Sequence, residues 1–482
     1  MRAWFTIIAL VAGISSQILG ADTLHTESQP NRYRDLNEYA QVDALLNDFL
    51  QKTQVAGFSV AVSRQGAIVY SRAFGYADVA KKTPMQPTSQ IRAASVSKVI
   101  TATALGKLAT DGKLDFDKPL KTYLPSLAEP YASLTTRQLA GHTAGIPHRP
   151  ASRKATNKHY DQAHETLPFF QDIPELLFEP NTAYQYSTLG YNLLAILIEE
   201  VAGKPFMDYM QEDIFAPLGM QQTFADDIYT ESAQNAQLYY LKNGKLLLDK
   251  KAQDGSYKLA GAGFRSTSLD LVAMMSAYSS GFIADEVVNE MFKSNRLVNG
   301  NATNVGIGWR INSDVNGRPT IEHAGSWQGA RTVIVYYPES ELAISIMVNT
   351  KCTMFIEETA HILAQFFLNE TAQNENRIEL NKSLEIVNQR SDGSIENYDG
   401  ELRLFKNANG ELQISTDRSW LQQNKVYRLP APGNFALLTI YGLLYLRIEA
   451  SPSLTGEVFQ YQVLSDRYHM TQKPMLYFKE KM

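Results

Sequence analysis

The sequence predicts an α/β fold of the α+β kind: an antiparallel sheet with flanking helices, an inserted helical subdomain, and a small C-terminal all-β domain. Residues 57–78 alternate apolar and polar side chains, whereas helical spacing dominates between about 100 and 300. Strand-like patterns return from Gly306. Strands at both ends imply one sheet built from distant segments, with helices on its faces and a cleft where it meets the subdomain.

The N-terminal elements are predicted in the order helix, hairpin, helix. Apolar residues recur at helical spacing over 36–52. The alternation that follows is interrupted at Gln65-Gly66, which predicts a turn and therefore a β-hairpin. The stretch IRAASVSKVITATALGKLATDGKLD, residues 91–115, then has the periodicity of a helix.

The later elements bring the chain back to the sheet and then into a second domain. A helical pattern starts at Tyr191, strands are predicted in GIGWRI, ARTVIVYYPES and ELAISIMVN, and a last helix is predicted over 355–370. Polar residues 371–377 predict a linker. Beyond it the pattern is nearly all β, with a hairpin turning at Asn409-Gly410. We therefore assign a β domain to 378–482 and expect it to fold separately.

Composition excludes some classes of partner. The chain has 482 residues, 44% of them hydrophobic and 20% charged, which is ordinary for a globular protein. Its formal net charge is −5 and it contains no basic stripe, so nucleic acid is not an expected partner. We expect a small-molecule or peptide substrate, and the sequence leaves the oligomeric state open.

The N-terminus predicts export. One arginine precedes an apolar run from Ala3 to about Gly20, followed by small residues, which is the layout of a signal peptide at 1–21. The alternative is an uncleaved membrane anchor, although the apolar run is short for a span. After cleavage we expect no stable membrane insertion. Cys352 is the only cysteine and cannot form an internal disulfide, and a periplasmic or secreted protein fits best.

Lys98 is the unusual residue of the helix that contains it. At about 100° per residue, Thr103, Lys107 and Asp111 form a polar stripe, and Lys98 lies on the opposite face with Ser95. Burial of a lysine is unfavourable unless it is neutral or paired, and burial lowers its pKa. A neutral amine one turn after a serine can accept the hydroxyl proton, which predicts Ser95 as nucleophile and Lys98 as base. Chance is the alternative for this spacing.

Several stretches, in a fixed order, resemble the penicillin-binding-protein and class C β-lactamase-like serine hydrolases. They span about 37–370 and include ASVSK, LTTRQLAGHTAGIP, YQYSTLGYNLLAILIEEVAGKPF, GAGFRSTSLDL and EHAGSWQGARTVIVYYP. The SxSK, YST and HxG combination most resembles the mitochondrial serine β-lactamase-like proteins and their bacterial relatives. The resemblance implies a β-lactamase/transpeptidase-like fold and a serine hydrolase domain at 22–372.

The resemblance implies a role for each matching residue. Ser95 would be the acylated nucleophile, Lys98 its base, and Tyr186 the relay that passes protons to the leaving group. Thr188 stands where the family has an asparagine that orients the substrate amide. His323 stands where the family has a lysine that supports the tyrosine and the substrate carboxylate.

The strand that contains HAG would also complete an oxyanion hole. Gly325 and Ser326 are expected to contact the substrate, with the backbone N–H groups of Ser95 and Ser326 as the two donors. Such donors supply roughly 3–4 kcal/mol each to the transition state.

The histidine in place of the family's lysine changes the expected chemistry. Histidine titrates near neutrality and lysine does not, so His323 provides no permanent cation for a penicillin-type carboxylate. Efficient β-lactam hydrolysis is therefore not expected. If His323 acts in catalysis, either charged or neutral, acyl transfer should have a midpoint within about one or two units of pH 6.5. The alternative is a hydrogen-bonded core histidine.

A second group of polar residues follows the HTAG turn. Zinc sites use residues of these types, but the spacings match no structural zinc pattern, so neither a metal nor another cofactor is expected. The segment is instead expected to overhang the cleft and to influence which substrate binds there. The group comprises His142, His148, His159, Asp161, His164 and Glu165.

The predicted function is that of a serine hydrolase that forms an acyl-enzyme on Ser95. A peptidase or peptidoglycan-type amidohydrolase is the leading interpretation, and an esterase or weak β-lactamase of the same fold is the alternative. A non-catalytic scaffold or ligand-binding protein is the alternative from another class. The sequence does not select the substrate, because one fold and nucleophile serve many hydrolases.

Overall fold

The structure is a computed structural model that describes residues 39–152, 156, 158–229, 232–250, 252–314, 316–352 and 354–368, and then 383–389, 395–416, 424–430, 434–450, 457–462 and 475–480. The predicted signal peptide at 1–21 and linker at 371–377 lie outside these residues. Within the described ranges, none of the helices combines the length and apolar character that a bilayer span requires.

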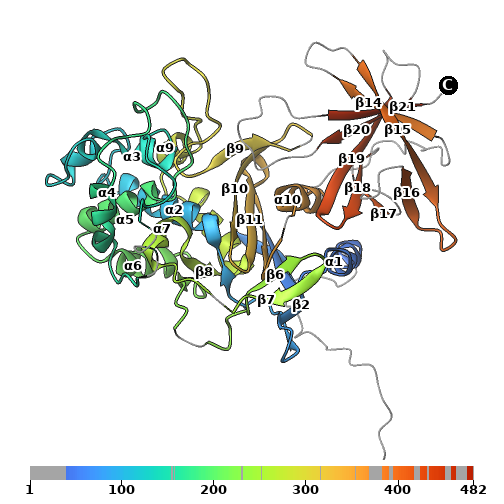
Figure 1. Ribbon diagram of the computed structural model, residues 1–482, viewed down its shortest axis with the longest axis horizontal. Helices are drawn as coiled ribbons and strands as arrows, with labels where there is room; N and C mark the ends of the chain where they lie inside the picture. Colours follow the sequence, from blue (N-terminus) through green and yellow to red (C-terminus); the bar gives the residue numbers. More distant parts are fainter. Residues whose placement is uncertain are drawn as a thin grey trace, which may run out of the picture.

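A seven-stranded antiparallel sheet forms the centre of the main domain, as predicted (Figure 1). Its pairing joins the N-terminal hairpin to strands nearly 300 residues later, because β1 lies beside β12. From edge to edge the strands are β3 (Thr83–Pro84), β2 (Ala67–Asp78), β1 (Gly57–Arg64), β12 (Leu342–Val348), β11 (Ala330–Tyr337), β10 (Pro319–Trp327) and β9 (Arg310–Ser313).

Alternation along the central strands separates two hydrophobic cores. On β11, Val333 and Val335 belong to one core, and Ile334 belongs to the other. Helices α1 (Ala40–Thr53) and α10 (Ile356–Ala364) cover the first face, and the helical subdomain covers the second. Both faces are therefore buried, which explains why the central strands are almost continuously apolar.

The remaining helices belong to the subdomain or border it (Figure 1). They are α2 (Ser97–Thr110), α3 (Thr136–Ala140), α4 (Pro168–Gln171), α5 (Gly190–Ala202), α6 (Phe206–Tyr209), α7 (Leu259–Ala262), α8 (Ser268–Met274) and α9 (Asp285–Met291). Two three-stranded sheets complete the domain: β4 (Ile91–Arg92), β8 (Phe264–Ser266) and β5 (Phe224–Ala225), and β13 (Thr350–Lys351), β6 (Tyr239–Lys242) and β7 (Lys245–Leu248).

Helix α2 is more deeply buried than its sequence pattern predicts. Thr103, placed on the polar stripe by periodicity, is fully buried, and its hydroxyl bonds to Tyr278 Oη at 2.9 Å. Of the three residues in the predicted polar stripe, only Lys107 and Asp111 are accessible to solvent. A hydroxyl that finds partners inside the core can occupy a buried helix face, and the helical wheel alone does not reveal this.

The C-terminal strands form a closed eight-stranded barrel. They are β14 (Ser383–Gln389), β15 (Ile395–Lys406), β16 (Leu412–Thr416), β17 (Asn424–Arg428), β18 (Asn434–Thr439), β19 (Gly442–Ala450), β20 (Glu457–Gln462) and β21 (Met475–Glu480). The predicted hairpin is β15–β16, and Gly410 takes a φ of 79° in its turn. Closure pairs the first strand with the last and leaves no unpaired edge.

The barrel shares a hydrophobic core with the main domain, which favours coupled folding, and separate folding of 378–482 stays a prediction. Leu438 and Leu443 belong to the same buried cluster as residues of α1 and α10, and α10 lies between sheet and barrel in Figure 1. Leu443 N donates to Thr359 Oγ1 at 3.1 Å, and Lys425 Nζ lies 2.7 Å from Asp48 Oδ2. Removing the barrel would expose this apolar surface to water.

Leu443→Ala should destabilise the whole protein rather than the barrel alone. Its side chain is 0% exposed in the shared core, and deletion of a buried leucine side chain costs about 2–5 kcal/mol. Calorimetry should show a lower Tm for the main-domain transition. Ile440→Ala, at a side chain that is 49% exposed, is the control and should change the unfolding free energy by less than about 0.5 kcal/mol. An unchanged main-domain transition in Leu443→Ala would contradict the coupling.

Candidate active site

The predicted nucleophile lies on a short turn directly before α2. Ser95 is the middle residue of the 3-10 turn Ala94–Val96, two residues before the first residue of α2, Ser97. Ala94 takes a φ of 48°, a strained conformation for a residue with a side chain. Ser95 is half-buried, lines a cleft, and its hydroxyl has no hydrogen-bond partner among the described residues. The turn therefore presents the hydroxyl to the cleft.

Lys98 lies at 0% exposure in the first turn of α2, on the side predicted to be buried. Its Nζ donates to Gly261 O at 2.8 Å and to Thr188 Oγ1 at 3.0 Å. No carboxylate pairs with it among the described residues. Burial, with a smaller contribution from the charge of Arg310, holds the Lys98 pKa well below its ordinary value. This geometry fits a neutral amine. Both of its hydrogens are donated in hydrogen bonds, and its lone pair can accept a proton.

The Lys98 site depends on close backbone approach between α7 and the YST segment. A Cβ on Gly261 would lie 2.7 Å from Thr188 Cγ2 and 3.0 Å from Thr188 O, so only glycine brings the accepting carbonyl this close. Thr188, expected to orient the substrate amide, also uses its hydroxyl to hold the lysine. It lines the same cleft as Ser95.

Tyr186 is surrounded by the lysine and three imidazoles. Lys98 Nζ lies 4.6 Å from the centroid of the Tyr186 ring. The ring centroids of His142, His148 and His323 lie 4.4, 5.5 and 6.4 Å from that of Tyr186. The structure thus brings Lys98, Tyr186 and His323 together, as the sequence predicted.

His142 and His148 hold the YST backbone in place. His142 Nδ1 accepts from Ser187 N, and His148 Nδ1 accepts from Thr188 N, both at 3.2 Å. Each accepting nitrogen must be unprotonated, so both neutral rings carry their hydrogen on Nε2. Burial, followed by the charge of Lys98, lowers the pKa of His142 strongly and that of His148 to about 4.

The surroundings of His323 favour its neutral form and count against the predicted midpoint near pH 6.5, which stays a prediction. It is 1% exposed on β10, and burial, followed by the charges of Arg310 and Lys98, lowers its pKa well below the usual value. Its Nδ1 lies 2.9 Å from Ala324 O. Because a carbonyl only accepts, Nδ1 carries the hydrogen and Nε2 is a free acceptor. His323 therefore supplies no positive charge to a substrate at neutral pH.

Strand β10 packs directly against the nucleophile turn. A Cβ on Gly325 would lie 2.9 Å from Ser95 N, 2.6 Å from Ala93 O and 2.4 Å from Thr332 Oγ1. The Thr332 hydroxyl donates to Ala93 O at 2.7 Å and fixes the turn to the sheet. Ser326 follows Gly325 and lines the same cleft as Ser95, so the two residues predicted to form the oxyanion hole border one cavity.

The cleft beside Ser95 lies where the sheet meets the subdomain, as predicted, and has about 140 Å³ of free volume. Its lining includes cationic and aromatic groups and no carboxylate among the described residues. The lining residues are Ser95, His148, Arg149, Pro150, Thr188, Leu189, Asn192, Gln253, Tyr257, Lys258, Ala262, Ser326 and Trp327.

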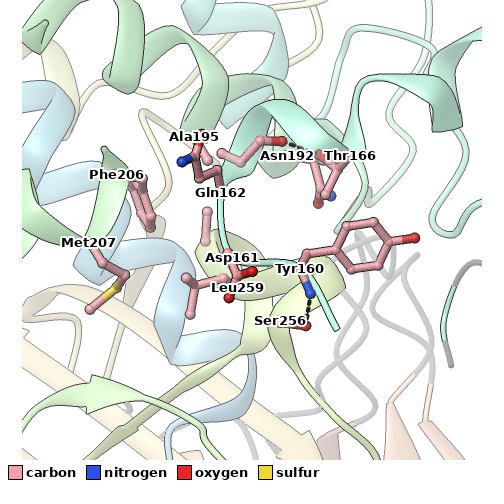
Figure 2. A pocket seen from close by; sticks show the side chains of 12 residues that line it. Tyr160, Asp161, Gln162, Thr166, Asn192, Ala195, Phe206, Met207, Ser256 and Leu259 are labelled. Carbon is pink, nitrogen blue, oxygen red and sulfur yellow. Dashed lines mark hydrogen bonds between the residues drawn. The ribbon is translucent and has the colours of Figure 1, made fainter. Parts of the chain in front are cut away.

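The polar residues after the HTAG turn separate into different roles. His142 and His148 reach Tyr186, whereas His164 Nδ1 bonds to Glu199 and His159 Nδ1 lies 2.6 Å from Asp254 Oδ2. Figure 2 shows the neighbouring contact, in which the backbone N of Tyr160 donates to Ser256 Oγ at 3.0 Å. The segment therefore fastens the 254–258 loop that borders the cleft.

The chain matches the Beta-lactamase family over residues 42–365, a range that contains every site residue described above. The chain belongs to this family. It is 29% identical over 329 residues to Penicillin-binding protein 4* of Bacillus subtilis, covering 62% of this chain and 69% of that protein. It is also 29% identical to the human protein named Serine beta-lactamase-like protein LACTB, mitochondrial, covering 51% of this chain and 58% of that protein.

Solved structures show the same fold. D-amino acid amidase from Ochrobactrum anthropi SV3 is similar with a TM-score of 0.55 and 25% identity, over 64% of this chain and 91% of that one. The octameric penicillin-binding protein homologue from Pyrococcus abyssi covers 91% of this chain and 99% of its own, with a TM-score of 0.58 and 19% identity. The similarity to the Pyrococcus abyssi protein extends to the barrel, and at this identity it is evidence for the fold only.

Sequence reasoning missed the residues that surround the predicted motifs. His142 and His148 were considered only as metal ligands or loop residues, although the family motif HTAG contains the first. Lys258 immediately precedes the LAGAGF stretch and carries no recognisable signal. Their places depend on long-range packing against β10 and the YST segment, which periodicity does not report.

Gly325→Ala should disable acylation. The added Cβ would press β10 away from Ser95 N and separate the two oxyanion donors, and loss of one such donor lowers kcat by about 10²- to 10³-fold. Gly190→Ala is the matched control, because its Cβ would meet nothing closer than 3.4 Å. Acylation rates and Tm should be measured together. Full activity in a folded Gly325→Ala protein would contradict the placement of the oxyanion hole.

Proposed function

We propose that this protein is a serine hydrolase that forms an acyl-enzyme on Ser95 and cleaves amide bonds, as a peptidase or a peptidoglycan-type amidohydrolase. One observation carries the proposal. Lys98 is buried one turn from Ser95, without a carboxylate partner among the described residues, and donates two hydrogens to fixed acceptors. That is the environment of an amine used as a base.

Acylation begins with transfer of the Ser95 proton to the Lys98 lone pair. The Ser95 oxygen attacks the substrate carbonyl, and the N–H groups of Ser95 and Ser326 stabilise the negative oxygen that forms. Tyr186, close to Lys98, passes a proton to the leaving amine as the scissile bond breaks. His323 offers its bare Nε2 as an acceptor for the Tyr186 hydroxyl and keeps that group oriented.

Deacylation repeats the sequence with water in place of the serine. Water gives a proton to the basic pair of Lys98 and Tyr186 and attacks the ester carbonyl in the same oxyanion hole. Ser95 recovers its proton as the acid product leaves. Because Lys98 acts when deprotonated, acylation should be lost as the pH falls through its lowered pKa, and His323 should add no step near pH 6.5.

The substrate class rests on the relatives and on the absence of a cation at His323. A relative of the same fold is a D-amino acid amidase, which favours amide chemistry. A neutral His323 gives no fixed cation for a penicillin carboxylate. An ester or a slowly hydrolysed β-lactam remains the second candidate, because the Ser95 hydroxyl is open to the cleft. The buried Lys98 argues against the alternative of a non-catalytic scaffold, because a scaffold has no use for a buried base.

An active-site probe should label Ser95 and no other residue. A fluorophosphonate or fluorescent penicillin should acylate the wild type, and Ser95→Ala should remove all labelling with little change in Tm. Ser97→Ala is the matched control, because Ser97 is fully buried and its hydroxyl accepts from Phe264 N at 3.2 Å. Mass spectrometry of the modified peptide identifies the residue. Labelling at Ser97, or labelling that survives in Ser95→Ala, would contradict the assignment.

We place the mature protein outside the cytoplasm, because the N-terminal apolar run is typical of a cleaved signal peptide. Mass spectrometry of the protein from soluble periplasmic or secreted fractions should find a terminus near Ala21 or Asp22. An intact Met1 terminus in the membrane fraction would instead support the anchor alternative.

A further inference from the structure

The cleft beside Ser95 is electrostatically one-sided. Lys258 and Arg149 line it, and no aspartate or glutamate is among its described lining residues. Arg149 is exposed at the rim, whereas Lys258 is partly buried at the end of the 3-10 turn Ser256–Lys258. Neither side chain has an ion-pair partner among the described residues. A cleft of this composition attracts an anion.

Lys258 is held in place beside the oxyanion hole. Its Nζ lies 3.6 Å from the centroid of the Trp327 ring, and Trp327 directly follows Ser326 on β10. Arg92 also contacts this ring, with its Cζ 4.0 Å from the centroid. The fully buried Arg92 pairs with Asp226 at 2.7 Å, a carboxylate that it shares with Arg265. Arg92 does not line the cleft and Lys258 does, so the Lys258 ammonium is the cation beside Trp327 that a ligand in the cleft can reach.

The loop that carries Lys258 is fastened on its other side. Asp254 Oδ2 bonds to His159 Nδ1, and Ser256 Oγ accepts from Tyr160 N (Figure 2). Asn192 Nδ2 donates to Tyr257 O at 2.7 Å and ties the loop to α5. The ammonium is therefore positioned by fixed contacts rather than by a free surface loop.

The order of residues along β10 assigns this cleft to the acyl part of the substrate. His323, which lies beside Tyr186 on the leaving-group side, is three residues before Ser326, and Trp327 is one residue after it. Ser95 and Ser326 line the cleft, whereas Tyr186 and His323 are not among its described lining residues. A carbonyl bound between Ser95 and Ser326 thus directs its leaving group to Tyr186 and its acyl group toward Trp327 and Lys258.

We propose that Lys258 is a specificity-determining residue that binds a carboxylate on the acyl part of the substrate, with Arg149 assisting at the rim of the cleft. The proposal rests on the acyl-enzyme function argued above. It makes the preferred substrate an acyl donor with an anionic group beyond the scissile carbonyl, and it assigns that recognition to a site other than the HAG motif.

The surroundings of Lys258 support this assignment. Burial is the largest cause that lowers the Lys258 pKa to about 7, the charges of Arg92 and Arg149 act in the same direction, and the charge of Asp226 opposes the change. A bound carboxylate would supply the missing counter-charge. Since the ammonium is charged below its pKa, the preference for an anionic acyl group should be strongest at low pH and decline as the pH rises past neutrality.

A matched pair of substrates tests the proposal. The benzyl thioesters of N-succinyl-D-alanine and N-succinamoyl-D-alanine differ only in a terminal carboxylate or carboxamide, and the released thiol is measured. The wild type should prefer the carboxylate in kcat/KM by about 10- to 100-fold, as a charged hydrogen bond provides. Lys258→Gln should lose this preference and Lys258→Arg should keep it. Lys121→Gln, at an exposed lysine in a distant 3-10 turn, is the control.

Each outcome decides the proposal. Equal rates for the two substrates in the wild type, or an unchanged preference in Lys258→Gln, would overturn it while leaving the Ser95 function intact. If neither substrate acylates Ser95, both the role of Lys258 and the acyl-enzyme function are overturned. If Lys258→Gln does not fold, the pH series decides: the carboxylate preference must fall above about pH 7 in the wild type and persist in Lys258→Arg. A preference independent of pH in both proteins would contradict the role of Lys258.

Discussion

The burial of Lys98, with no counter-ion in the part of the chain that the structure describes, is the constraint on which the site depends. An ammonium group in this environment would be strongly disfavoured, so the fold stabilises the amine and fixes it with two acceptors, Gly261 O and Thr188 Oγ1. Those acceptors come from α7 and from the YST segment, which must meet at the first turn of α2. The close approach at Gly261 makes this meeting possible.

The same constraint explains the neutral imidazoles around Tyr186. Each positive charge near Lys98 disfavours protonation of the neighbouring groups, and burial acts in the same direction on His142 and His323. The rings serve as hydrogen-bonding supports, with their tautomers set by backbone groups. The cleft has its positive charge near Trp327, which the Lys258 ammonium contacts, and we propose that this charge binds the substrate. In the proposed function, β10 therefore separates the residues that transfer protons from the residues that bind the anion.

Sequence patterns predicted the sheet, the helical insertion, the C-terminal β region and the burial of Lys98 one turn after Ser95. These features follow from local periodicity and from motifs with fixed spacing. The closed barrel and its shared core did not follow from the sequence, because Leu443 reaches Thr359, and joins the same buried cluster as Phe49, only through packing between distant segments. The protonation of His323 was also beyond sequence reasoning, since residue type suggests titration near neutrality and burial on β10 removes it. The role of Lys258 was likewise not predictable, because it depends on contact with Trp327, which is distant in the sequence.

The protonation state of Lys98 tests this account most directly. NMR of the protein labelled with ¹³Cε-lysine, with the Lys98 signal assigned by its loss in Lys98→Met, reports whether the amine is charged. The account predicts a neutral Lys98 at pH 7 and a titration well below that of an ordinary lysine, as burial requires. A Lys98 that is still an ammonium at pH 9 would show that it is not the base of this site.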